Sequence, residues 1–358
     1  MIKRELHMSF VSHHVERRTR RNSFLRQINL LIDWKPIEKE IDKVYKKGQS
    51  VDGRPSYPGI LLFKMMLLQQ WYSLSDPGVE DMVNENLSAM AFCGLQIEDD
   101  VPDHSVISRF RTELTQKKAF DRMLKKINDQ LEKKKIMVKE GSALVDASIT
   151  DTPRKPKGKS TYEVAVDRKE DERPIEELQK EEKQLKLIKK KQPGVDEEGR
   201  WLKKSGKLHY GYKKHIATED EGLVTAVHTT TANEHDSKGF KPLLKKVPKN
   251  KLKKGAFADK GYKVPTNDEY LKENKIKNRT QHKAYKNRPL TDWQIRFNKL
   301  ISQDRYKVER TFGGMKRWFG AGLARYVGLE KAHTQHVMEA IAYNLYRSPG
   351  IVISKGLG

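Results

Sequence analysis

The sequence holds a single cysteine among 358 residues. One thiol can form neither an intrachain disulfide nor a cysteine-rich zinc site, so both are excluded. Cys93 has apolar neighbours and is expected to be a small core residue. No two histidines show the H-x-x-x-H spacing of a helical zinc site. The glycine motifs that bind nucleotides and the GxSxG motif of serine hydrolases are also missing.

Long hydrophobic runs are lacking too. The longest apolar stretch covers residues 60–68, contains Lys64, and is about half of the roughly 20 residues that span a bilayer. Charged residues rather than an apolar segment follow Met1, so no signal peptide is expected. The sequence therefore predicts no membrane partner and a location in the cytoplasm.

Acidic residues are too few to balance the basic ones. Lys and Arg together number 72 and Asp and Glu 48, which gives a formal net charge of +24. Such a charge attracts polyanions, and without a membrane segment it favours nucleic acid as the partner. The length suits about two to three domains with a sizeable core.

Residues 1–138 are predicted to form a helical domain. Residues 59–74 are apolar almost all round, as expected of a central helix. The Asp-Pro-Gly triplet at 76–78 is expected to break this helix, and a second helix is expected at 79–95.

A further helix is expected to start near residue 102, with Asp103 or Ser105 as its N-cap. It carries Arg109 and Arg111 near its start, where helix-turn-helix proteins contact DNA. A plain helical domain is the alternative, but the two arginines favour DNA binding.

From residue 139 onward, short runs typical of strands alternate with amphipathic segments. Thr291 and Gln294 form a capping-box pattern that starts a long helix. The order of strand, hairpin, helix, strand, helix, strand and helix is that of an RNase H-like core. The expected strands are 142–150, 208–218, 223–231, 256–258 and 275–277. The expected helices are 237–246, capped by Asp236, and a long helix that starts at 291. A last helix, 330–347, is expected within a C-terminal helical segment at 320–358.

Residues 153–206 interrupt this core between its first and second strands. Lys and Glu dominate the segment, and a helical stretch expected at 175–191 has few apolar residues. A solvated insertion is favoured over a specific clamp on DNA. The expected fold is thus α+β, with a helical DNA-binding domain at 1–138 followed by an RNase H-like mixed-sheet catalytic domain at 139–358.

Three carboxylates are expected to meet in that core. Asp146 and Asp259 each end a short apolar run, on strands that lie side by side at the centre of an RNase H-like sheet. Glu309 follows on the helix that packs against the sheet. Hard oxygen ligands with open positions suit two Mg²⁺ or Mn²⁺ ions, which can assist an in-line phosphoryl transfer.

Each carboxylate also has a plainer interpretation. An aspartate at a strand end can be a turn or cap residue, and Glu309 with Arg305 can be a helical ion pair. Gly313 and Gly314 cost a helix roughly 1 kcal/mol each. They argue against a merely structural helix and are expected where a DNA strand approaches closely.

Sequence motifs run through most of the chain. They include PDHS at 102–105, VDAS at 145–148 and ADKGY at 258–262, and Glu309 lies between Arg305 and Lys316. With these motifs the chain resembles the bacterial insertion-sequence transposases of the DDE class, specifically the group named after insertion sequence five. In that family's Y-R-E-K signature the tyrosine position is Ser302 here.

The resemblance implies that Asp146, Asp259 and Glu309 are the catalytic residues and bind the metal ions. It implies double-stranded DNA as the partner, at the terminal inverted repeats and the target, with a homodimer holding the two ends. Candidate DNA contacts are cations of these motifs and of the helical domain: Arg305, Lys316, Lys213, Lys260, Arg310, Arg54, Arg109 and Arg111.

The sequence therefore predicts a transposase that binds terminal repeats, cuts DNA and joins the freed 3′ ends to a target. An RNase H-like metallonuclease without strand transfer uses the same triad, and this alternative stays open. A non-catalytic DNA-binding descendant is a third possibility. The intact triad argues against it, because three carboxylates within a basic surface repel DNA.

Overall fold

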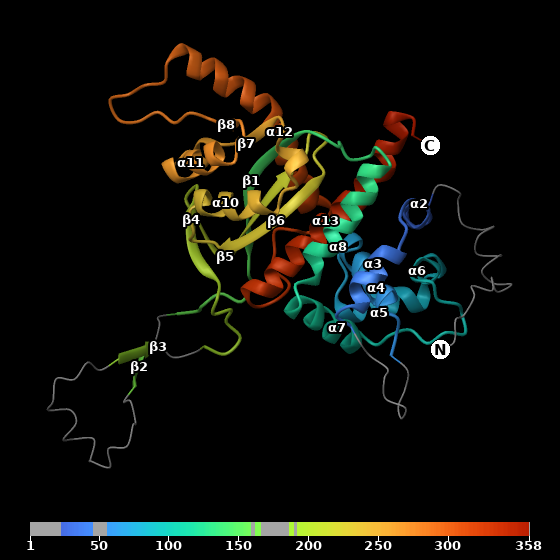
Figure 1. Ribbon diagram of the computed structural model, residues 1–358. Helices are drawn as coiled ribbons and strands as arrows, with labels where there is room; N and C mark the ends of the chain where they lie inside the picture. Colours follow the sequence, from blue (N-terminus) through green and yellow to red (C-terminus); the bar gives the residue numbers. More distant parts are fainter. Residues whose placement is uncertain (1–22, 46–55, 159–161, 166–185, 190–191, 358) are drawn as a thin grey trace, which may run out of the picture.

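The computed structural model describes residues 23–45, 56–158, 162–165, 186–189 and 192–357 (Figure 1). The first part is helical: α2 (Phe24–Leu31), α3 (Lys35–Asp42), α4 (Gly59–Trp71), α5 (Asp76–Glu85), α6 (Leu87–Cys93), α7 (His104–Gln116) and α8 (Ala119–Lys133). Helix α4 is buried on nearly all sides and contacts α3, α5, α6 and α7. Its apolar residues therefore mark a central helix, as predicted.

The triplet at 76–78 starts a helix instead of breaking one. Ser75 Oγ accepts a hydrogen bond from Gly78 N (3.0 Å) and caps α5. Pro77 lies in the first turn, where a missing amide hydrogen costs nothing. The single helix predicted at 79–95 is divided in two, because Asn86 ends α5 and caps α6.

The second part contains a mixed sheet. Its strands are β1 (Ser142–Asp151), β4 (Arg200–Lys204), β5 (Lys207–Thr218), β6 (Val224–Thr231), β7 (Gly255–Ala258) and β8 (Asn278–Thr280). Their order is β4-β5-β1-β7-β8, with β6 also paired to β5. Strand β1 is antiparallel to β5 and parallel to β7. The predicted mixed sheet with its helices is thus present and is consistent with an RNase H-like core.

Successive residues of β1 face opposite helix layers, as the pleat of a strand requires. Ala143 and Val145 pack in a core with α10 (Asp236–Lys246) and α11 (Pro265–Glu273). Leu144 packs in a larger core with α12 (Asp292–Phe319) and α13 (Leu329–Lys355). The predicted capping box of Thr291 and Gln294 starts α12.

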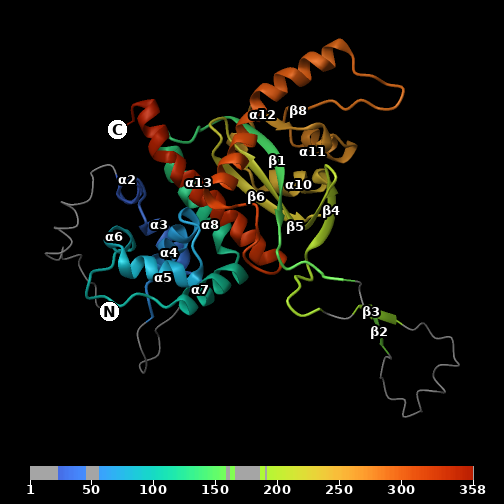
Figure 2. The same cartoon turned by 180° about the vertical axis from the view of Figure 1, so that it is seen from behind.

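Helix α13 connects the two parts of the molecule. It contacts β5 and β6 on one side and α2, α4, α7 and α8 on the other, and it runs between sheet and helices in Figures 1 and 2. Trp71 Nε1 donates to Ala342 O (3.0 Å), and Asn344 Nδ2 donates to Asn128 Oδ1 (2.9 Å). One hydrophobic core therefore extends through both predicted domains. The boundary at 138/139 stays a prediction.

Two local predictions were wrong. The strand expected at 275–277 is β8 at 278–280, because Lys275 has a left-handed backbone (φ 55°) that ends the preceding turn. Helix α10 is capped by His235 rather than Asp236, since Asp236 pairs with Lys213 (2.7 Å).

The predicted insertion contains more strand than expected. Strand β4 lies inside 153–206 and belongs to the main sheet. Strands β2 (Tyr162–Ala165) and β3 (Lys186–Lys189) form a separate antiparallel pair. The helix predicted at 175–191 is therefore wrong for 186–189, and its remainder lies outside the described residues.

The structure bears on two expectations from composition: the place of Cys93 and the absence of a membrane-spanning helix. Cys93 is buried in α6, as predicted for a core residue. In the described part of the chain, no helix combines the length and the hydropathy that crossing a bilayer requires.

An ion pair is fully buried between β5 and α13. Lys214 Nζ bonds with Glu339, and both side chains are 1% exposed. Gln335 Nε2 donates to the other oxygen of Glu339 (2.8 Å), and Lys214 also donates to Ala321 O (3.3 Å). The pair thus fixes α13 against the sheet and holds the loop that follows α12.

We expect Glu339→Ala to lower the free energy of unfolding by about 3 to 5 kcal/mol, because it leaves the Lys214 ammonium buried without its counter-ion. The matched control is Glu140→Ala, whose partner Lys253 and own side chain are both more than half exposed. That control should change stability by less than about 1 kcal/mol. Urea unfolding of both variants measures the difference, and equal losses would contradict the account.

Candidate active site

The parallel register of β1 and β7 places Asp146 next to Asp259 on the neighbouring strand. Ser142 pairs with Gly255 and Leu144 with Phe257, an offset of 113 residues. Asp146 and Asp259 differ by the same number, so extending the register by two residues sets them side by side. Asp146 also lies on the Leu144 face of the strand, which is the face that α12 covers.

Asp259 is fixed by the turn that follows β7. Its Oδ1 accepts a hydrogen bond from Gly261 N (2.8 Å) and thereby caps a short 3₁₀ helix, η2 (Lys260–Tyr262). The aspartate thus has the structural role of a cap, which its plainer interpretation foresaw. A cap does not exclude a ligand role, because one carboxylate offers two oxygens.

Helix α12 carries the third carboxylate across the sheet. It contacts β1 and β7, and the Arg305 guanidinium lies 3.6 Å from Asp146 Oδ1 and 3.7 Å from Glu309 Oε1. Arg305 is buried, whereas the Glu309 side chain is 60% exposed. Glu309 therefore faces solvent at the edge of the site, and Arg305 lies beneath it.

Gln281 connects the tyrosine position of the signature to Arg305. The Ser302 hydroxyl accepts a hydrogen bond from Gln281 Nε2 (2.7 Å), and Arg305 donates to Gln281 Oε1 (3.5 Å). Arg305 Nε is buried and has no hydrogen-bond partner among the described residues. The guanidinium therefore contacts Asp146, Glu309 and Gln281, and its Nε is left as an unpaired donor within the described residues.

Burial dominates the protonation of Asp146. The pKa of this carboxyl is raised from 3.8 to about 6: burial is the largest cause, the Arg305 charge acts against it, and the charges of Asp259 and Glu309 contribute to the rise. Negative charges that raise the pKa of a neighbouring carboxyl favour a bound cation at the same place. The donor set is all carboxylate, which suits Mg²⁺ or Mn²⁺. The residues therefore fit a divalent metal ion.

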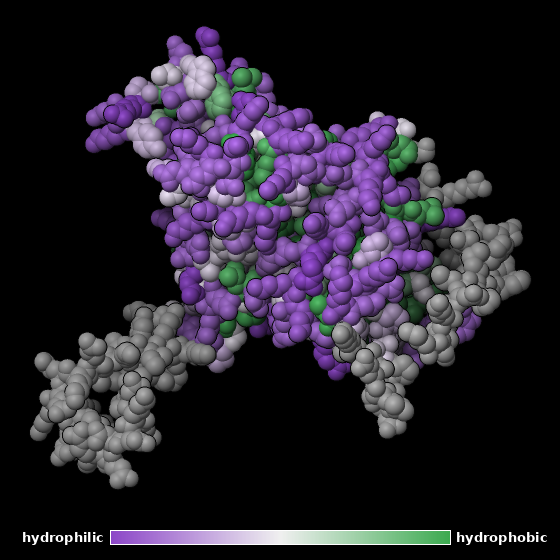
Figure 3. All heavy atoms as spheres, in the orientation of Figure 1, coloured by the Kyte–Doolittle hydropathy of each residue, from purple (hydrophilic) through white to green (hydrophobic). Residues whose placement is uncertain are grey.

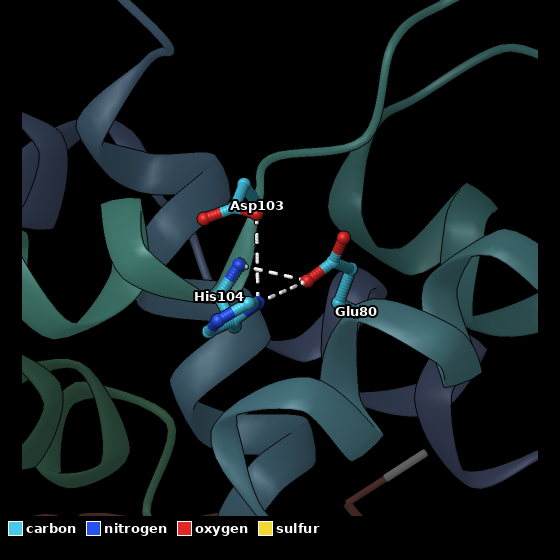
Figure 4. Close-up of side chains that lie close together, drawn as sticks. All are labelled: Glu80, Asp103 and His104. Carbon is cyan, nitrogen blue, oxygen red and sulfur yellow. Dashed lines mark hydrogen bonds and ion pairs between the residues drawn. The ribbon is translucent and has the colours of Figure 1, made fainter.

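The carboxylate oxygens of Asp146, Asp259 and Glu309 lie farther apart than the ligand atoms of an occupied metal site. Within the described residues, the group whose ligand atoms all lie within 4.8 Å of one another is Glu80, Asp103 and His104 (Figure 4). Helix geometry accounts for this second group. Asp103 accepts from Ser105 N (2.7 Å) as the N-cap of α7, and Glu80 accepts from His104 N (2.8 Å) and bonds His104 Nδ1 (2.9 Å). These contacts attach α7 to α5 without a metal ion.

A large cavity lies elsewhere in the molecule. It measures about 800 Å³ and is bounded by α8, β6, α10 and α13. Asp121, Lys246 and His333 bond to one another in its wall. The catalytic candidates Asp146, Asp259 and Glu309 do not line it.

Comparison with known proteins agrees with this geometry. Residues 143–345 match the family model described as "Transposase DDE domain", and residues 13–113 match "Transposase domain (DUF772)". The chain is 35% identical over 241 residues to the transposase for insertion sequence element IS1106 of Neisseria meningitidis serogroup B, which covers 67% of this chain and 76% of the relative. This chain belongs to the DDE transposases of insertion sequences. No solved structure matches it.

The transposase prediction is thereby confirmed. The protein is an enzyme of a class that acts on DNA by phosphoryl transfer and uses divalent metal ions. The narrower assignment to the group named after insertion sequence five stays a prediction, as do the individual site residues.

Two of the cations predicted to contact DNA are buried in the transposase. Arg111 is 5% exposed and pairs with Asp76, and it also stacks on the Tyr326 ring (4.4 Å). Lys213 is 7% exposed and pairs with Asp236. Both cations are buried and are neutralised by partly exposed carboxylates, so we withdraw them as DNA contacts.

The other predicted cations differ in accessibility. Arg305 lies in the site, and Arg54 falls outside the described residues. Arg310 is exposed and reaches the turn between β5 and β6, where it donates to Glu221 O (3.4 Å). The remaining predicted contacts are exposed: Lys316, Lys260 and Arg109.

Gly313 and Gly314 of α12 were both expected to allow close approach of a DNA strand, but their surroundings differ. A Cβ on Gly314 would lie 3.0 Å from Trp318 and from Tyr343 of α13, so this glycine permits close packing of two helices. A Cβ on Gly313 would meet nothing within 4 Å. The expectation that DNA explains both glycines is therefore wrong for Gly314.

Sequence reasoning missed an arm that projects beside the site. We call residues 281–300 the arm; it includes the loop before α12 and the first turns of that helix (Figure 1, upper left). Trp293 and Phe297 stack (5.3 Å), and His282 packs edge-on against both. Interspersed aromatic and basic residues after β8 were the available signal.

We expect Asp146→Asn to raise the melting temperature of the metal-free protein at pH 7.5. The folded carboxyl holds its proton up to about pH 6 and the unfolded one only to 3.8. Stability therefore falls as the pH rises through that window. Above it the cost is at most about 3 kcal/mol, from a shift of about two pKa units.

The measurement is thermal unfolding in chelator at pH 7.5 and at pH 3.5. At the lower pH the stability difference between wild type and variant should nearly vanish, because Asp146 is mostly protonated in both the folded and the unfolded state. A variant that is less stable than wild type at pH 7.5 would contradict the electrostatic account.

Proposed function

We propose that this transposase cuts and joins DNA at a site formed by Asp146, Asp259 and Glu309. The observation that carries the proposal is the convergence of three elements: β1 and β7 in a register that aligns the aspartates, and α12 crossing both. The carboxylates would hold two Mg²⁺ ions, with Mn²⁺ able to substitute. Bound metal lowers the pKa of the attacking water or 3′-hydroxyl and stabilises the leaving oxygen.

Arg305 would act at two stages. In the free protein its guanidinium lies between Asp146 and Glu309 (3.6 and 3.7 Å) and balances part of their charge. When those carboxylates bind metal, Arg305 can turn its guanidinium to a DNA phosphate, for which its planar fork is suited. Lys316 lies two helical turns beyond Glu309 on the same face and would bind a neighbouring phosphate.

The arm would support the duplex away from the site. Its exposed cations are Lys283, Lys286, Arg288, Arg296 and Lys299, against one acidic residue, Asp292. Trp293 is 63% exposed among them, and Figure 3 shows pale and green side chains among the purple ones of this projection. With a rise of about 1.5 Å per residue, Trp293 lies roughly 24 Å along α12 from Glu309.

The helical part would recognise the terminal inverted repeats. Arg109 is exposed near the start of α7, where a recognition helix meets DNA, while the predicted partner Arg54 is outside the described residues. Transposition joins two ends to one target, so we propose a homodimer on DNA. The enzyme would act in the cytoplasm, where bacterial DNA lies.

A cleavage and joining assay tests the proposal. The substrate is a labelled duplex carrying the terminal repeats of the element that encodes the protein, with Mg²⁺ or Mn²⁺ and a target plasmid. Wild type should cut and join, whereas Glu309→Gln should bind the duplex with unchanged affinity and do neither. Cutting without joining would favour a metallonuclease. Cutting by Glu309→Gln at the wild-type rate would contradict the site.

We expect the triple variant Lys283→Ala, Lys286→Ala, Arg288→Ala to bind DNA more weakly and with a smaller salt dependence. Each lost phosphate contact lowers the slope of log K against log salt by about 0.9, so the slope should fall by about 2 to 3. Fluorescence anisotropy over a range of salt concentrations measures it.

The matched control for the arm is Lys125→Ala, Lys133→Ala, Lys134→Ala, which removes three cations around the distant helix α8. This control should leave the slope unchanged. Equal slopes for the wild type and the arm variant would show that the arm does not touch the duplex.

A further inference from the structure

Gln281 is the residue at which the chain leaves the sheet and enters the arm. It directly follows β8, and its N–H donates to Ala258 O (3.1 Å), the last carbonyl of β7. Ala258 immediately precedes Asp259. The backbone of Gln281 is therefore fixed beside the strand end that carries one of the proposed catalytic aspartates.

The side-chain amide of Gln281 bonds at three points along α12. Its Nε2 donates to Asn298 O (3.2 Å) and to Ser302 Oγ (2.7 Å), and its Oε1 accepts from Arg305 Nη1 (3.5 Å). The Ser302 hydroxyl gives its own proton to Asn298 O (3.0 Å), so it can only accept from Gln281. Two acceptors on one side and a guanidinium, which only donates, on the other leave the amide a single orientation.

The Arg305 guanidinium is divided between this amide and the carboxylates. Its Nη2 lies 3.6 Å from Asp146 Oδ1 and 3.7 Å from Glu309 Oε1, whereas its Nη1 bonds with Gln281. Asp146 and Glu309 are proposed metal ligands, and a bound metal ion would balance the charge that Arg305 balances in the free protein. The bond to Gln281 involves no proposed ligand, so metal binding does not compete with it.

We propose that Gln281 is a positioning residue that holds one end of the Arg305 guanidinium while the other end turns from the carboxylates to a DNA phosphate. This inference rests on the proposed function, because it assumes that Arg305 binds the phosphate once the carboxylates hold metal. A guanidinium has two terminal nitrogens in a planar fork, so one nitrogen can stay on the amide as the other binds phosphate. Gln281 acts through Arg305 and contacts neither metal nor DNA in this role.

The test compares Gln281→Met, Arg305→Ala and the double variant with the wild type. Met keeps the length of Gln without its polar atoms. One measurement is the single-turnover cleavage rate of the labelled terminal-repeat duplex in Mg²⁺ at saturating protein, and the other is duplex affinity by fluorescence anisotropy in chelator. The matched control is Asn298→Ala, whose side chain bonds His282 N (2.8 Å) and His282 O (3.0 Å) within the arm.

The proposal expects Gln281→Met to lower the saturated cleavage rate about 10- to 100-fold, the order of loss that a small misplacement of a catalytic group causes. Duplex affinity should change less than about twofold, because it arises from many phosphate contacts. In the Arg305→Ala background the substitution should have no further effect, because nothing is left to position. Asn298→Ala should cleave at the wild-type rate once saturated.

Wild-type cleavage by Gln281→Met would overturn the inference. An equal loss in Asn298→Ala, or a full further loss in the Arg305→Ala background, would also overturn it, because Gln281 would then only brace the arm. Thermal unfolding in chelator checks the fold. If Gln281→Met does not fold, Ser302→Ala decides instead: it removes the shortest bond of the amide and should slow cleavage only when Arg305 is present.

A structure of crystals soaked in Mn²⁺ gives a readout that does not depend on turnover. Arg305 Nη1 should remain bonded to Gln281 Oε1 while Nη2 leaves Asp146, and departure of both nitrogens from their partners would contradict the inference.

The Arg305→Ala variant separates the two levels of the argument. If it cleaves slowly while Gln281→Met cleaves as wild type does, the role proposed for Arg305 stands and that of Gln281 fails. If Arg305→Ala cleaves at the wild-type rate, the proposed role of Arg305 fails and takes the inference with it.

Discussion

Parallel pairing of β1 with β7 in a single register is the constraint on which the site depends. A slip of one residue would turn Asp146 to the opposite face of the sheet, toward α10 and away from α12. The register is fixed by burial on both faces, with Ala143 and Val145 in one core and Leu144 and Phe257 in the other. Hydrophobic packing thus determines where the charged chemistry can take place.

The cations around the sheet are of two kinds: some form ion pairs that stabilise the fold, and others are available to bind DNA. Lys213 and Lys214 are neighbours on β5 and face opposite layers; Lys214 is neutralised by the buried Glu339, and Lys213 by the partly exposed Asp236. At the site the balance differs, because Arg305 compensates Asp146 and Glu309 only in part and the pKa of Asp146 stays near 6. Repulsion between incompletely compensated carboxylates destabilises the metal-free site, and a bound metal ion removes this repulsion.

Much of the core was predictable from local pattern, whereas long-range pairing was not. The apolar runs that end at Asp146 and Asp259 and the capping box at Thr291 are local signals, and both led to correct elements. Arg111 looked like a DNA contact because its partner Asp76 is 35 residues away and on another helix. Gly314 looked functional because Tyr343, which it accommodates, lies on α13. Strand β4 was hidden in a Lys- and Glu-rich segment whose composition resembles a solvated insertion.

Anomalous diffraction from a crystal of the protein soaked in Mn²⁺ tests the central claim most directly. The account predicts anomalous peaks between the side chains of Asp146 and Asp259, with Glu309 drawn toward them and the Arg305 guanidinium displaced from Asp146. A peak at Glu80, Asp103 and His104 with none at the aspartates would contradict it, because the tighter geometric cluster would then be the metal site and the aligned carboxylates would be structural.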